Sequence, residues 1–217
     1  TLRRAALGPG AEEAEDLAER EYQRDVEVAV LEMQGKSRDS DAEADALKKL
    51  AELKGRSIAE TGALATACVM SLVLPAPSGL PDGLPKVHPS EPAGTDKDLL
   101  AQLAKQLETN GEMLEAMIKK RADQILAINK VEALALSASP FVKRTGGVRY
   151  LGAAAKTLQV LYDADVFSEE AVIAWGQQKE AALSLDPDMD ARFFEKAKPF
   201  INWLEEASSS EEESDEE

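Results

Sequence analysis

Two short segments near the C-terminal end of the sequence combine aromatic rings with carboxylates. The first runs from Leu161 to Trp175 and the second from Phe200 to Glu206, and they hold both tryptophans of the chain. An aromatic ring packs against the aliphatic stem of a lysine while a nearby carboxylate attracts its ammonium group. The pattern therefore predicts a docking surface for a lysine-rich partner, formed by Tyr162, Asp163, Asp165, Glu169, Glu170, Trp175, Phe200, Trp203, Glu205, Glu206, Glu211, Glu212 and Glu213.

The two tryptophans of these segments are expected to differ in burial. Trp175 lies in an apolar run and is interpreted mainly as a core anchor. Trp203 is followed at once by acidic residues, so part of its ring is expected at the edge of the acidic surface. The Ser/Glu tail after it can bury nothing and is expected to add long-range attraction, whereas the two ordered segments set the specificity.

The whole chain is strongly acidic, with a formal net charge of −16 from 25 basic and 41 acidic residues. Such a field repels nucleic acids and anionic membranes and attracts basic proteins. One basic cluster contrasts with it, and it is either a solvated helix face or a second docking patch for an acidic partner. Its members are Lys119, Lys120, Arg121, Lys130, Lys143, Arg144 and Arg149.

Residues for catalysis or metal binding are few. The single histidine, His88, lies among prolines and is interpreted as a solvated loop residue, and the single cysteine, Cys68, lies in an apolar run and is expected to be buried. Asp163 and Asp165 alone are weak evidence for a cation site. No glycine-rich phosphate loop is present. We therefore expect neither a metal nor a cofactor.

An all-α fold must position these residues. The chain is 44% hydrophobic but only 5% aromatic, and its Ala, Leu, Glu and Lys content favours helices. Apolar spacing and turn residues predict eight to ten short helices, stacked as antiparallel pairs of the HEAT-like or α-solenoid kind. The Asn110-Gly111 dipeptide predicts a turn between two helices, and Ser168 is the expected N-cap of another.

The expected organisation is one helical-repeat domain between two flexible ends. Residues 1–16 form a flexible lead-in, residues 17–207 the domain, and residues 208–217 a disordered acidic tail. A proline-rich loop at 75–94 interrupts the helices, because six of the ten prolines fall there and proline is incompatible with a helix interior. The sequence contains neither a bilayer-spanning apolar run nor an N-terminal leader, so a cytoplasmic location is expected.

The two aromatic-and-acidic segments at the end of a helical-repeat domain resemble a known family. It is the C-terminal domain shared by eukaryotic translation initiation factor five, the epsilon subunit of the exchange factor for initiation factor two, and the factor-five mimic proteins. The first family box matches Leu161 to Trp175, and the second matches Phe200 to Glu206 together with the tail. The helices between Leu99 and Leu134 fit more loosely, and residues 1–45 hardly at all.

The resemblance implies HEAT-like helix pairs and binding to the lysine-rich tail of the beta subunit of initiation factor two. In factor five the same domain also gathers other initiation factors and uses basic patches, which favours a docking role for the basic cluster. The GTPase-activating part of factor five is a separate zinc-ribbon domain without counterpart in this sequence, so that activity is not expected here.

Two alternatives to a factor-five docking module remain open at this point. A catalytic guanine-nucleotide exchange domain of the epsilon type would use Glu52 and Trp203, although Arg56 stands near a position where that family has an apolar residue. A generic acidic helical scaffold with no role in translation is the other.

Overall fold

The computed structural model describes residues 9–34, 36, 39–76, 81–136 and 146–212. Within these ranges the chain forms nine helices and no strand, which confirms the all-α prediction. The helices are α1 (Pro9–Gln34), α2 (Ser40–Leu53), α3 (Ile58–Ser71), α4 (Asp96–Met117), α5 (Arg121–Ala135), α6 (Val148–Gly152), α7 (Ala154–Asp163), α8 (Glu169–Leu185) and α9 (Arg192–Glu212).

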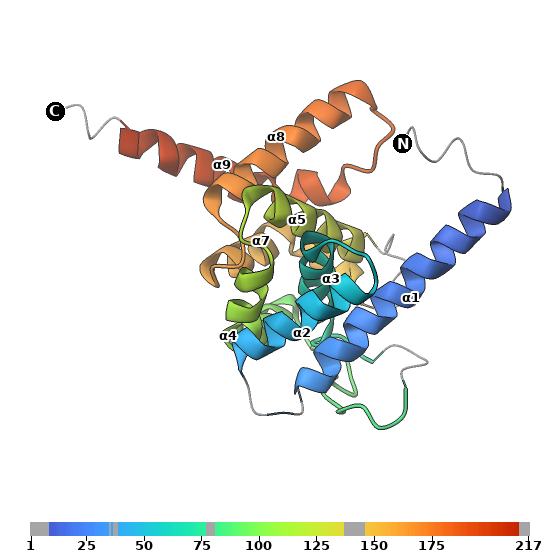
Figure 1. Cartoon of the computed structure of the whole chain (residues 1–217). Helices are drawn as coiled ribbons and strands as arrows, with labels where there is room; N and C mark the ends of the chain where they lie inside the picture. The colour runs from blue at the N-terminus through green and yellow to red at the C-terminus, as the bar shows by residue number, and fades with distance from the viewer. Residues whose placement is uncertain (1–8, 35, 37–38, 77–80, 137–145, 213–217) are drawn as a thin grey trace.

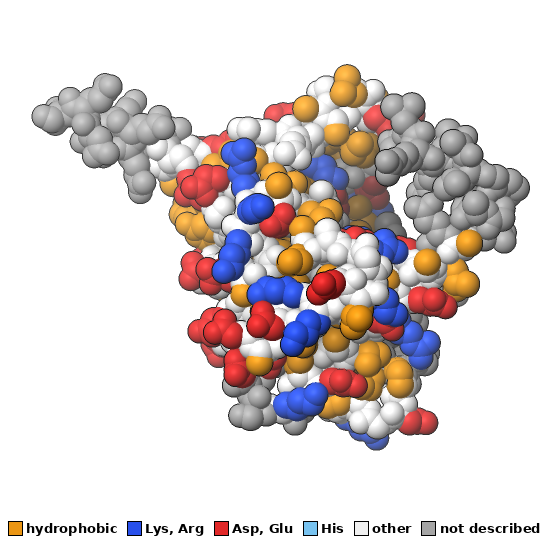
Figure 2. Space-filling view, viewed as in Figure 1, with side chains coloured by type: hydrophobic (Ala, Val, Ile, Leu, Met, Phe, Trp, Pro, Cys, Tyr) orange, Lys and Arg blue, Asp and Glu red, His pale blue; other side chains and the backbone are white. Residues whose placement is uncertain are grey.

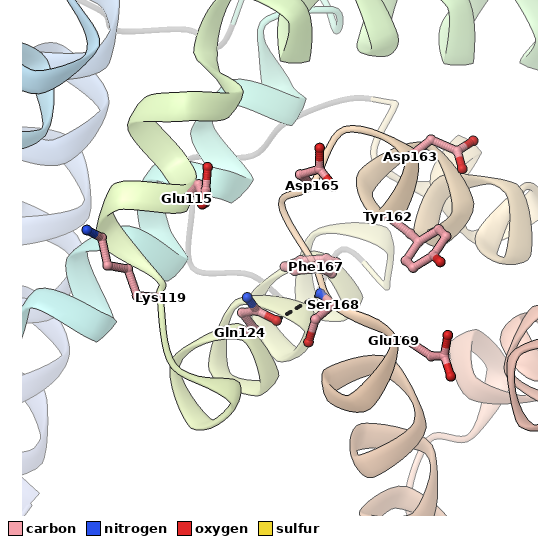
Figure 3. Close-up of a pocket in the computed structure, with 9 residues that line it drawn as sticks. All are labelled: Glu115, Lys119, Gln124, Tyr162, Asp163, Asp165, Phe167, Ser168 and Glu169. Atoms are coloured by element: carbon pink, nitrogen blue, oxygen red, sulfur yellow. Dashed lines mark hydrogen bonds between the residues drawn. The ribbon is translucent and has the colours of Figure 1, made fainter. Parts of the chain in front are cut away.

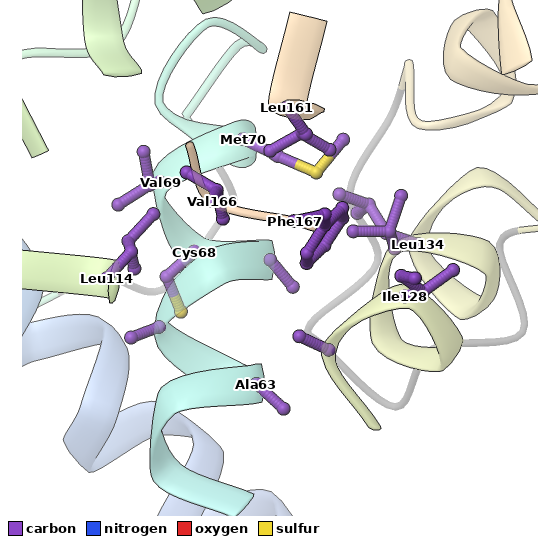
Figure 4. Close-up of a cluster of buried hydrophobic side chains, with 14 of the residues drawn as sticks. Ala63, Cys68, Val69, Met70, Leu114, Ile128, Leu134, Leu161, Val166 and Phe167 are labelled. Atoms are coloured by element: carbon purple, nitrogen blue, oxygen red, sulfur yellow. The ribbon is translucent and has the colours of Figure 1, made fainter. Parts of the chain in front are cut away.

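Helix α3 is the centre of the packing. It is surrounded by α1, α2, α4 and α5, and every residue from Thr61 to Ser71 is buried. The core then continues through α5 to α8 and from α7 to α9, so the C-terminal helices form an outer layer on the same body (Figure 1). Figure 4 shows side chains from α4, α5 and the turn after α7 converging on α3 around Cys68 and Met70. The expected burial of Cys68 is confirmed.

Side-chain caps start several of the helices. The Ser57 hydroxyl accepts from the Glu60 amide at 3.1 Å, and Thr95 and Asp98 form a reciprocal capping box at the start of α4. Ser168 accepts from the Ala171 amide at 3.3 Å and caps α8, as predicted. These caps satisfy amide groups that have no partner within the helix.

The turn predicted at Asn110-Gly111 is wrong, because α4 continues through both residues. The Asn110 side chain donates to the Gln106 carbonyl oxygen at 2.7 Å, and its own oxygen accepts from the Gln34 side chain of α1 at 3.0 Å. Asn110 therefore bonds across to a neighbouring helix instead of starting a turn. The backbone after α7 lies close to α4 at Gly111, since a Cβ there would be in van der Waals contact with the Ala164 carbonyl oxygen at 3.5 Å.

Both ends of the domain are more helical than expected. Helix α1 begins at Pro9, inside the expected lead-in, and α9 continues to Glu212, past Ala207. Residues 1–8 and 213–217, and therefore Glu213, lie outside the described residues. The described part of 75–94 contains no helix.

The interpretation of His88 as a solvated residue is wrong. Its Nδ1–H donates to the Leu74 carbonyl oxygen at 3.0 Å, and its Nε2 is buried without a hydrogen-bond partner. Burial lowers the pKa of the imidazole. The hydrogen bond to Leu74 ties the proline-rich loop to the residues just after α3.

Candidate docking site

The turn between α7 and α8 positions the carboxylates of the first box. After α7 the Asp165 amide donates to the Tyr162 carbonyl oxygen and the Val166 amide to the Leu161 carbonyl oxygen, both at 3.0 Å. Asp165 has the left-handed φ of 56°, so the turn is a Schellman motif. Leu161 and Val166 are both fully buried and anchor it. The turn thus leaves Asp163 and Asp165 exposed at the surface.

These residues line an open hollow of about 850 Å³, which we call the box hollow. Glu115 and Lys119 stand on one side of it, Asp163 and Asp165 on the other, and Gln124 and Ser168 lie between them (Figure 3). The Ser168 amide donates to the Gln124 side-chain oxygen at 2.9 Å, which ties the start of α8 to α5. The remaining lining residues are Tyr162, Phe167 and Glu169.

An aromatic ladder joins the two boxes. The Tyr162 ring meets Phe200 edge-on with 5.8 Å between centroids, and Phe200 stacks on Trp203 at 5.8 Å with 15° between the ring planes. Trp203, at the outer end of the ladder, keeps 54% of its surface exposed. The ladder therefore runs from the box hollow to an exposed indole on α9.

The acidic residues of the second box lie on α9, the helix that carries Phe200 and Trp203. The Ser208 hydroxyl donates to the Glu169 carboxylate, so the far part of α9 lies against the first turn of α8. Glu170 and Glu206 are exposed, and Glu205 is half-buried. Glu211 and Glu212 lie in the last turn of α9, and their side chains are outside the description. The structure thus brings the two boxes together.

Trp175 is a correction to the predicted contact set, because its ring is buried and only 1% exposed. The indole N–H donates to the Asn129 side-chain oxygen at 3.0 Å, and the ring meets Phe193 and Phe194 edge-on. A partner on the surface does not reach a ring enclosed in this way. Trp175 instead joins α5, α8 and α9, in agreement with its interpretation as a core anchor.

The predicted basic cluster is not one patch in the structure. Lys130 lies 3.8 Å from Glu19 of α1, and Arg149 pairs with Asp96 at 3.3 Å. Asp96 begins α4 and Lys119 follows its end, so about 30 Å of helix separates Arg149 from Lys119. Lys119, Lys120 and Arg121 are exposed together between α4 and α5, while Lys143 and Arg144 lie outside the described residues.

The two residues of the exchange-domain alternative lie in different surroundings. Glu52 is exposed near the end of α2 and lines a hollow with Asp45, Lys48, Lys49, Arg56 and Ile58. Trp203 stacks on Phe200 of α9 instead. The structure therefore does not join these two residues into one site.

Several residues of the site were not predicted from the sequence. Glu115 and Gln124 line the box hollow although they lie far from both boxes in sequence, and Asn129 holds Trp175. Lys119 was assigned to a basic patch but lines the acidic hollow. Glu115, Lys119 and Gln124 reach the hollow only because α4 and α5 pack against the turn between α7 and α8. Among the described residues, no cluster of three or more His, Cys, Asp or Glu side chains is arranged to hold a metal ion.

Comparison with known proteins identifies the C-terminal region. Residues 123–216 match the family model described as W2, eIF4-gamma/eIF5/eIF2-epsilon. This region of the chain is a W2 domain, and the resemblance to the domain shared by factor five and the epsilon subunit is confirmed. The match covers α5 to α9 and both boxes.

Three relatives similar to this chain carry the name eukaryotic translation initiation factor 5. The protein from Zea mays is 29% identical over 112 residues, which is 52% of this chain and 22% of the relative. The one from Phaseolus vulgaris is 33% identical over 102 residues, 47% of this chain and 20% of the relative. The one from Caenorhabditis elegans is 37% identical over 68 residues, which is 31% of this chain and 15% of the relative. The chain thus matches about a fifth of the length of these relatives.

No helix in the described ranges has both the length and the apolar character needed to cross a membrane.

Proposed function

We propose that this domain is a docking module that binds the lysine-rich tail of the beta subunit of initiation factor two, as its resemblance to the domain of factor five implies. The observation that carries the proposal is the aromatic ladder, which connects an acidic hollow to an exposed indole. Lysine stems would pack on Trp203 and Tyr162, and their ammonium groups would meet Asp163, Asp165 and Glu206.

The comparisons support this assignment at a coarser level. The W2 match and the three relatives named initiation factor 5 point to translation initiation, so other initiation factors are the natural partners and the cytoplasm the expected compartment. The proposed role is non-catalytic, because the surface presents rings and carboxylates suited to binding. The exposed residues from Lys119 to Arg121 are retained as a proposed contact for a further, acidic partner.

The direct test is the affinity of the domain for a fluorescently labelled peptide with the sequence of that lysine-rich tail. Trp203→Ala should lower the affinity about tenfold or more, since interface tryptophans often contribute over 1–2 kcal/mol. Asp163→Asn combined with Asp165→Asn should lower it as well. The binding constant should also fall steeply between low and physiological salt, because exposed charges are screened.

Each matched control removes the same kind of side chain, apolar or charged, at a position away from the proposed docking surface. Leu185→Ala removes an 88% exposed apolar side chain at the end of α8, and Asp82→Asn removes an exposed charge in the proline-rich loop. Neither should change the affinity by more than about twofold. Unchanged binding in a Trp203→Ala variant that also lacks residues 208–217 would contradict the proposal.

A further inference from the structure

A second hollow adjoins the box hollow. It has a volume of about 530 Å³ and is lined by Asp39, Ser40, Asp41, Glu112, Glu115, Ala116 and Lys119. Glu115 and Lys119 also line the box hollow, so the two meet at the end of α4. We call the second one the α2–α4 hollow.

The α2–α4 hollow is a built feature between two helices. The Ser40 hydroxyl donates to the Glu112 carboxylate at 2.9 Å, which fixes the start of α2 against α4. The Asp39 carboxylate accepts from the Ala42 amide at 3.0 Å and caps α2. In Figure 2, acidic side chains gather along the left edge, where Figure 1 places the start of α2, the end of α4 and the turn after α7.

Among the described residues that line these two hollows, Lys119 is the one cation, against seven carboxylates. Its side chain is exposed, and in Figure 3 its amine points away from Asp163 and Asp165. A positive charge at the junction raises the potential there, while the carboxylates on both sides lower it. The groove therefore has two negative ends and a positive centre.

We propose that the two hollows form one groove for an extended lysine-rich segment, and that Lys119 divides it into two subsites. The inference rests on the proposed function and extends it across α4 to α2, which lies outside the W2 match. Each of the two hollows binds one run of lysines, and the uncharged residues between these runs lie beside Lys119. A continuous lysine run must place a like charge beside Lys119, so this residue selects partners whose lysines come in separated blocks.

The test uses two synthetic peptides with the same number of lysines. In one the lysines form a single run, and in the other a glycine-serine spacer splits them into two runs. The full chain should bind the split peptide more tightly by about two- to fivefold at physiological salt, where a surface charge acts over a Debye length of about 8 Å. Lys119→Gln should abolish this preference by tightening the binding of the continuous peptide.

Lys105→Gln is the matched control, because Lys105 is an exposed lysine on α4, the helix that Lys119 follows, and its loss changes the net charge equally. It should leave the preference between the two peptides intact. A companion variant, Asp41→Asn with Glu112→Gln, should weaken the split peptide about two- to fivefold and leave a peptide with one short lysine run unaffected. Thermal unfolding of each variant verifies that the fold is kept.

The outcomes separate the two proposals. If Trp203→Ala weakens peptide binding while Lys119→Gln behaves like Lys105→Gln, the divided groove is wrong and the docking function stands. Weaker binding of lysine peptides to Lys119→Gln also overturns the groove. If no lysine-rich peptide binds the chain, both proposals fall.

Discussion

Trp175 and Trp203 belong to the same pair of helices but lie in opposite environments. Trp175 is enclosed by Asn129, Phe193 and Phe194, whereas Trp203 stacks on one ring and exposes the rest of its indole. The same residue type therefore supports the helix packing in one region and belongs to the proposed docking surface in the other. The inner region holds α5, α8 and α9 in place so that the outer region can present its ring and carboxylates.

The largest expected effect is the replacement of the inner tryptophan. Trp175→Ala should lower the free energy of unfolding by about 3–5 kcal/mol, because it leaves a cavity where three helices meet. Trp203→Ala should cost less than about 1 kcal/mol, since over half of the ring is already in water. Urea denaturation of both variants measures the difference, and equal losses would contradict the division into two regions.

The next largest loss of stability is expected where α8 and α9 pack closely in the inner region. A Cβ on Gly176 would lie 3.0 Å from the Ile201 side chain, so α8 and α9 approach closely there. Gly176→Val should cost about 1–3 kcal/mol through overpacking. The neighbouring exposed position provides the control, because Gln177→Val should stay within about 0.5 kcal/mol in the same denaturation experiment. A Gly176→Val variant as stable as this control would show that α8 can move outward freely.

The hydrogen bond of Trp175 should contribute a smaller amount. Asn129→Ala leaves the buried indole N–H without its acceptor and should cost about 1–2 kcal/mol. Asn202→Ala on the exposed face of α9 should be nearly neutral. Unfolding midpoints compare the two, and a neutral Asn129→Ala would mean that the N–H finds another partner.

The pH dependence of the inner region is the smallest effect. Burial raises the pKa of the Glu132 carboxyl, although its ion pair with Lys179 opposes the shift. A raised pKa means that the folded state holds this proton more tightly than the unfolded state does. The contribution of Glu132 is therefore fully present below the ordinary pKa of about 4.3 and is lost as the pH rises through the folded value.

Glu132→Gln removes this titration. The stability of the unaltered chain relative to Glu132→Gln should therefore decline as the pH is raised through the range above about 4.3. Unfolding curves of both proteins across that range measure the decline. Glu180→Gln, at an exposed position of α8, should show no such trend. A constant difference between the unaltered chain and Glu132→Gln would contradict the raised pKa.

The unmatched N-terminal helices are part of the same body as the W2 domain. Helices α1 to α4 lie before the matched residues, yet α3 packs against α5 and the core cluster runs from Tyr22 to Leu204 without division. Glu115 near the end of α4 and Lys119 just after it show the consequence, because both line a hollow whose other wall is the first box. The proposed docking surface therefore includes residues on both sides of the start of the W2 match.

Local patterns were sufficient for the helical class, several boundaries and the nature of the boxes. The caps at Thr95 and Ser168 could be predicted because a side chain three residues before an amide satisfies it locally. The acidic and aromatic content of the boxes and the contrast between Trp175 and Trp203 also follow from neighbouring residues. Each of these features depends on contacts within a few positions of the chain.

Tertiary structure decided the features that depend on distant neighbours. Asn110 lies within a helix, and its side-chain oxygen accepts a hydrogen bond from Gln34 on another helix. Arg149 is separated from Lys119 by the length of α4, and Lys119 joins an acidic groove instead of a basic patch. Sequence by itself determined that this chain would be helical and would carry aromatic-and-acidic boxes. Only the packing of the helices decided which carboxylates share a surface and which charge stands among them, because surface neighbours are set by contacts between elements far apart in the chain.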